Sequence, residues 1–104
     1  MDVVPQSRID LFAEMESHYE KQDTQYFVKL LDHDDYVVRC RATCILVDLG
    51  GEDKVQYVAK VLKDDPNELV RHEAAWTIYL KYFYKFYIVS FFVKVCFHSL
   101  NPFS

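Results

Sequence analysis

His72 and Glu73 form the single histidine–glutamate dipeptide of this 104-residue sequence, and their side chains are of the types that bind non-haem iron. A neutral imidazole and a carboxylate can hold such an ion and leave positions open for oxygen. Neighbouring residues of an α-helix lie about 100° apart, so both side chains can flank one surface. Ordinary helix chemistry is the alternative, because Glu73 near a helix start would favour the positive end of the helix dipole or pair with Arg71.

The other residues of types that could bind a metal or act in catalysis form no recognisable site. Glu14 and His18 lie one helical turn apart, which predicts a solvent-exposed contact rather than a ligand set. Cys40 and Cys44 are four residues apart on an expected helix, and we interpret them as small core residues. The sequence has no glycine-rich phosphate loop, Cys-x-x-Cys pair or nucleophile elbow, so no catalytic residue is assigned.

The charge and cysteine content exclude some classes of partner and setting. All 16 acidic residues lie in residues 1–78, together with nine of the 12 basic residues. This acidic body would repel nucleic-acid phosphates, so no nucleic-acid partner is expected. An odd number of cysteines, three, and the lack of a signal peptide indicate a reducing setting, and the protein is expected in the cytoplasm.

Turn and cap signals divide the sequence up to Ile78 into helices. Ser7 and Asp10 have the spacing of a capping box, and Gly50-Gly51 is a helix stop signal. Acidic turns at 32–35 and 64–67 offer caps for the helices that follow them. Helices are therefore expected over about residues 7–21, 24–31, 37–49 and 54–62 and from Glu68 onward. The apolar stripe of the first helix is expected to hold Ile9, Phe12, Ala13 and Met15.

Two segments of the sequence repeat each other at a nearly constant spacing. Each is a helix, an acidic turn and a second helix, and neither pair of helices could bury its apolar face alone. Leu31 matches Leu62, and Val38, Arg39, Ala42 and Leu46 match Val70, Arg71, Ala74 and Ile78. The pattern predicts an all-α fold, an α-solenoid fragment of helical hairpins. Its expected parts are an N-terminal helix at 1–22, repeats at 23–51 and 52–78, and an atypical segment at 79–104.

The block Leu-Val-Arg-His-Glu-Ala-Ala at 69–75, with Gly50-Gly51 upstream, resembles a known family. The repeats are similar to the HEAT-like repeats of phycobilisome lyases, and most similar to the early repeats of deoxyhypusine hydroxylase. That resemblance implies an iron-dependent enzyme that hydroxylates deoxyhypusine in translation initiation factor 5A. It also implies that His72 and Glu73 are metal ligands, one of four such pairs that hold two irons. The equivalent residues of the first repeat, Cys40 and Arg41, would contribute no metal ligand.

Residues 79–104 depart from the repeat pattern. They hold 10 of the 17 aromatic residues and no acidic residue. Three interpretations stay open: a membrane tail, a helix that caps the last hairpin, or a sequence foreign to the family, such as a frameshifted or mis-spliced one. A membrane span is the weakest of these, because Lys85 and Lys94 leave far fewer than the roughly 20 apolar residues that a spanning helix needs.

Two functions follow from the sequence. The first is a part of a deoxyhypusine-hydroxylase-like enzyme, inactive by itself because two protein ligands cannot build a two-iron site, with iron as cofactor and translation initiation factor 5A as partner. The second is a HEAT-like module that binds another protein and does no chemistry.

Overall fold

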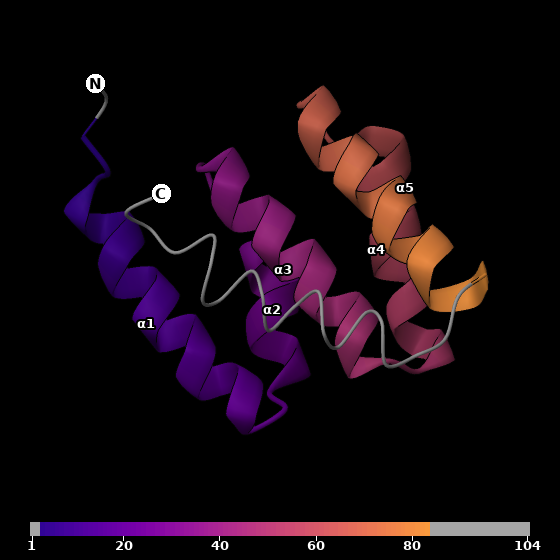
Figure 1. The fold of residues 1–104 in the computed structure, drawn as a ribbon, viewed down its shortest axis with the longest axis horizontal. Helices are drawn as coiled ribbons and strands as arrows, with labels where there is room; N and C mark the ends of the chain where they lie inside the picture. Colours follow the sequence, from indigo (N-terminus) through magenta and orange to yellow (C-terminus); the bar gives the residue numbers. More distant parts are fainter. Residues whose placement is uncertain (1–2, 84–104) are drawn as a thin grey trace.

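The computed structural model describes residues 3–83, and this part of the chain contains five α-helices and no strand (Figure 1). The expected all-α fold is confirmed. The helices are α1 (Gln6–Glu20), α2 (Thr24–Leu30), α3 (Tyr36–Leu49), α4 (Glu52–Asp64) and α5 (Glu68–Phe83).

Helix α3 is the centre of the arrangement, because it contacts each of the other four helices. Helices α2 and α3 form one hairpin, α4 and α5 form a second, and the two hairpins stack through α3 and α5. In the view of Figure 1, α4 lies behind α5 and α2 lies partly behind α3, while α1 lies on the outer side of the first hairpin. The described helices thus stack side by side as a short α-solenoid.

Side-chain caps set the starts of three helices. The Asp23 carboxylate accepts from the Tyr26 N–H at the start of α2, and the Asp35 carboxylate accepts from the Val37 N–H at the start of α3. Each cap satisfies an N–H group that has no partner within its helix. The start of α5 is capped in the same way, because the Asn67 side-chain oxygen accepts from the Leu69 N–H.

The glycine pair ends α3 as its sequence predicts. Gly50 has a φ of 77° and a ψ of −178°, a backbone conformation that is almost restricted to glycine. The chain therefore leaves α3 at Gly50 and enters α4 directly after Gly51.

The first helix differs from its prediction. Helix α1 begins after Pro5, which makes no side-chain cap, so the capping box predicted at Ser7 and Asp10 is wrong. Proline has a backbone angle suited to a helix start and no N–H to satisfy, and it therefore begins a helix without a polar side chain. Phe12 and Met15 are buried as expected, but Ala13 is exposed.

The core runs through the middle of α3, where every residue from Ala42 to Asp48 is buried. Leu46 is fully buried, and so are Phe27 of α2 and Met15 of α1. Burial of one such side chain stabilises the fold by about 1.5–3 kcal/mol. An unbroken buried run of this kind needs neighbours on more than one side of the helix, and α3 has them.

The atypical segment predicted at 79–104 begins inside a helix, because α5 continues to Phe83. The three interpretations of that segment concern residues 84–104, which lie outside the described residues. Across residues 3–83, no helix combines the length and the apolar character that crossing a bilayer requires.

Candidate functional site

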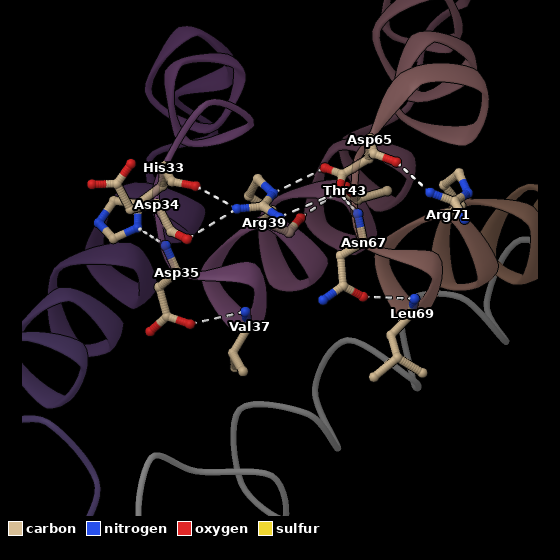
Figure 2. A network of polar contacts seen from close by, with 10 residues as sticks. All are labelled: His33, Asp34, Asp35, Val37, Arg39, Thr43, Asp65, Asn67, Leu69 and Arg71. Atoms are coloured by element: carbon tan, nitrogen blue, oxygen red, sulfur yellow. Dashed lines mark hydrogen bonds and ion pairs between the residues drawn. The ribbon is translucent and has the colours of Figure 1, made fainter.

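The two hairpins are joined by an ion pair between Arg39 of α3 and Asp65 in the turn before α5 (Figure 2). The Arg39 Nε donates to Asp65 Oδ2 at 2.9 Å, and Nη2 donates to Oδ1 at 3.3 Å. A two-point contact of this kind suits the planar guanidinium and fixes its orientation. Both side chains are largely buried, with exposed fractions of 12% and 4%.

The remaining nitrogen of the Arg39 guanidinium binds the turn within the arginine's own hairpin. The Arg39 Nη1 donates to the carbonyl oxygens of His33 and Asp34, at 2.8 and 3.1 Å (Figure 2). Asp65 in turn accepts from the Asn67 N–H at 2.9 Å. The arginine therefore links the turn of one hairpin to the turn of the next.

An equivalent pair joins α1 to the first hairpin. The Arg8 Nε donates to Asp35 Oδ2 at 2.6 Å, and Nη2 donates to Oδ1 at 3.0 Å. Burial would raise the pKa of Asp35, but the hydrogen bonds from Arg8 and the Val37 N–H hold that pKa below its ordinary value. The same two nitrogens of the arginine are used as in Arg39. Arg8 lies about one repeat length before Arg39, so α1 occupies the place of a preceding repeat's second helix.

Arg71 is the third arginine of this series, one repeat length after Arg39. Its Nη1 donates to the carbonyl oxygen of Asp65 at 2.6 Å, and in this it repeats the contact of Arg39 with its own turn (Figure 2). Among the described residues, its Nε and Nη2 have no acidic partner. We call the three arginines and the turns that they bind the arginine ladder.

The histidine–glutamate pair lies directly after Arg71 in α5, with its two side chains in different surroundings. His72 is exposed at a hollow of about 630 Å³ whose lining also includes Leu62, Leu69 and Arg71. Glu73 is half-buried toward α3, where burial raises its pKa and the nearby His72 opposes that rise. The alternative pairing of Glu73 with Arg71 is not among the contacts of the described residues, where the one charged neighbour that affects the pKa of Glu73 is His72.

The equivalent residues of the first repeat, Cys40 and Arg41, explain why His72 and Glu73 have different surroundings. Burial, together with the nearby carboxylates of Glu73 and Asp65, raises the pKa of the Cys40 thiol to about 11. Cys40 therefore faces the following hairpin and is not a reactive thiolate at neutral pH. Arg41 faces the other way, with its guanidinium carbon 4.0 Å from the centre of the Phe12 ring in α1. By the same geometry, His72 faces away from α3 and Glu73 faces toward it.

The described residues do not by themselves fit an iron site. His72 and Glu73 supply two donors, and no group of three or more histidine, cysteine, aspartate or glutamate side chains converges anywhere in residues 3–83. Metal centres in proteins draw on at least three protein ligands as a rule. Iron at this pair would need ligands from beyond the described part of the chain.

The second candidate pair from the sequence, Glu14 and His18, makes a long contact of 3.9 Å. His18 lies nearer to Asp23, with 3.0 Å between Nδ1 and Oδ2, and its ring stacks on Tyr26 at 3.7 Å. Burial, together with the nearby carboxylates of Glu14 and Asp23, raises the pKa of Tyr26 to about 12. The contacts of His18 with Asp23 and Tyr26 hold α1 against the start of α2, so His18 has a structural role.

An exposed apolar face on the second hairpin was not recognised from the sequence. Its large members are Leu62 of α4 and Leu69, Trp76 and Tyr79 of α5, with exposed fractions of 39%, 56%, 44% and 40%. We call these four residues the end face. The positions 69, 76 and 79 fall on one side of an α-helix. Trp76 and Tyr79 are also stacked on each other, with ring centres 5.8 Å apart.

The fold and the arginine ladder define an α-solenoid of stacked helical hairpins. Residues 13–78 match the family of HEAT repeats, which covers more than half of the sequence. The chain therefore belongs to the HEAT-repeat family. Neither the curated proteins nor the solved structures contain a match to it.

Proposed function

We propose that this protein is a HEAT-repeat module that binds another protein through the end face. The observation that supports the proposal is a difference between equivalent positions of the two repeats. Cys44 and Val47 of α3 are 4% and 7% exposed, whereas Trp76 and Tyr79, at the equivalent positions of α5, are 44% and 40% exposed. Solvated tryptophan, tyrosine and leucine side chains side by side are typical of a surface that a protein covers.

A capture experiment tests this proposal. The full chain, immobilised, would be exposed to a lysate of its source cells, and bound proteins would be identified by mass spectrometry. Replacement of an exposed leucine of the end face, Leu69→Asp, should remove a specific protein, because a carboxylate would be buried in the contact. The control is Val3→Asp, at an 89% exposed residue far from α5 in the chain, which should leave capture intact. A set of bound proteins that is the same for both variants would contradict the proposal.

A second candidate is a part of a deoxyhypusine-hydroxylase-like enzyme. It is supported by the Leu69–Ala75 block and by the place of His72, exposed at the end of the hairpin where a following repeat could bring further ligands. In this proposal His72 and Glu73 are one pair of iron ligands, translation initiation factor 5A is the protein partner and the cytoplasm is the setting. The bound metal would supply oxygen chemistry, and this chain's own residues would hold it.

Metal analysis of the purified chain tests the second candidate. Iron that is lost in His72→Ala and kept in His18→Ala would support the ligand assignment, since His18 already lies against Asp23 and Tyr26. Iron content that does not change with His72→Ala would exclude His72 as a ligand.

A further inference from the structure

Arg71, the last arginine of the ladder, indicates what kind of protein the end face binds. In both complete steps of the ladder, the Nε and Nη2 atoms of an arginine bind a carboxylate in the turn of the next hairpin. Arg71 holds its own turn through Nη1, as Arg39 does. Its Nε and Nη2, the two atoms that bind the carboxylate in Arg8 and Arg39, have no acidic partner within residues 3–83.

The apolar surroundings of Arg71 repeat those of Arg39. In the first repeat, the counterparts of Trp76 and Tyr79, Cys44 and Val47, are buried, and α3 contacts both α4 and α5. The counterparts of Leu62 and Leu69, Leu31 and Val37, are half-buried. Thr43 is fully buried, whereas its counterpart Ala75 is exposed. The second hairpin therefore presents to solvent the same surface that the first hairpin buries against its neighbour.

We propose that the end face docks a helical hairpin whose turn carries an aspartate or glutamate, held by Arg71 through Nε and Nη2. This inference rests on the proposed protein-binding function and adds the identity of the partner's docking element. The apolar residues of the end face supply contact area. The guanidinium supplies register, because a two-point contact with a carboxylate is possible in one orientation only.

A hairpin from the chain itself is a suitable probe. A synthetic peptide of residues 24–49 contains the turn that Arg8 binds, including Asp35, and contains no tryptophan. The single tryptophan of the full chain, Trp76, lies in the end face and reports binding by a blue shift of its fluorescence. The peptide need not be folded beforehand, because docking can complete its helices, and circular dichroism would record that gain.

The expected result is saturable binding that depends on the arginine and on the acidic turn together. Arg71→Gln in the chain, or Asp35→Asn in the peptide, should weaken binding about tenfold, and the two changes combined should weaken it little further. Asparagine caps a helix about as well as aspartate, so the peptide variant removes the charge and keeps the cap. Leu69→Asp in the chain should abolish binding through the loss of apolar contact.

Several results would overturn this assignment. Binding that is equal for all four combinations would remove the arginine and the turn from the contact, while the proposed function would still stand on the capture experiment. A lack of binding at peptide concentrations up to about 1 mM would reject the hairpin as the occupant. Protection of Trp76 from acrylamide in the full chain alone would assign the face to the same chain, and self-association lost in Arg71→Gln would assign it to a second copy.

Discussion

At the residue scale, the ladder contains two arginine–aspartate pairs with the same geometry and different burial. Arg39 and Asp65 are 12% and 4% exposed, whereas Arg8 and Asp35 are 23% and 19% exposed. Removal of one partner from a buried pair leaves a charge without compensation, and that cost falls steeply with access to water.

Replacement of the two arginines by methionine should therefore have unequal effects. Arg39→Met strands the buried Asp65 carboxylate and should lower the free energy of unfolding by about 3 kcal/mol. Arg8→Met should lower it by about 1 kcal/mol, because water can reach Asp35. Urea unfolding of both variants measures the difference. Equal losses would mean that burial does not govern the strength of these pairs.

The Arg8–Asp35 pair also predicts a dependence on pH. Burial would raise the pKa of Asp35, but the hydrogen bonds that its carboxylate accepts hold this pKa below the ordinary 3.8. The stability that its charge contributes is therefore present above about pH 4 and is lost as the pH falls through the lower, folded-state pKa. Asp35→Asn keeps the cap of α3 and removes this charge.

The variant Asp35→Asn should be less stable than the parent at pH 6 by about 1 kcal/mol, and this difference should shrink at pH 3. Chemical unfolding at the two pH values gives both numbers. A difference that is the same at pH 3 and pH 6 would show that the cost of the variant comes from something other than the carboxylate charge.

At the element scale, backbone conformation decides where the helices end. Gly50 has a φ of 77°, and a Cβ there would meet Lys81 Nζ at 3.5 Å, which is ordinary contact. The penalty of a side chain at this position would therefore come from the backbone alone. Gln22, between α1 and α2, has a φ of 56° and already carries such a penalty.

Opposite substitutions at these two positions should have opposite effects. Gly50→Ala should lower the free energy of unfolding by about 1–3 kcal/mol, and Gln22→Gly should raise it by up to about 1 kcal/mol. Thermal unfolding of the two variants checks both signs. Destabilisation by both would show that Gln22 makes contacts worth more than its strain.

The local signals in the sequence predict most of these helix ends, because a cap or a stop acts within a few residues. The Asp35 cap and the Gly50 stop are both confirmed. The capping box predicted at Ser7 and Asp10 is wrong, because Pro5 needs no polar partner to begin a helix. The contact of Arg39 with Asp65 joins residues 26 positions apart, and it depends on how two hairpins stack. Its one trace in the sequence is the return of the Val-Arg pair at the same place in the second repeat.

The candidate site was harder to predict than the fold. The pair His72 and Glu73 was chosen for its chemical type, but the direction of each side chain depends on which neighbour its helix has on each side. The end face was missed because its residues read as ordinary core positions of a repeat. Their exposure follows only from the lack of a covering element among the described residues.

At the scale of the whole molecule, the contacts of α3 with every other helix make the hairpins depend on each other. Repeat proteins of few units unfold together when the contacts between units are strong. A cavity in α3 should therefore lower the stability of both hairpins within residues 3–83.

The variant Leu46→Ala tests this coupling. Leu46 is fully buried, and its truncation should lower the free energy of unfolding by about 3 kcal/mol. The fluorescence of Trp76, in α5, and the helical circular dichroism should shift to the same new midpoint. Two separate transitions would show that the hairpins unfold independently.

The ladder also gives the molecule a direction. In each step the guanidinium belongs to the earlier helix and the carboxylate to the later turn. Two molecules that met through their end faces would not repeat this step, because each face presents an arginine of the ladder and no turn carboxylate for the other. A partner that docks as proposed would therefore bind heterologously, with its acidic turn against Arg71, and in one orientation only.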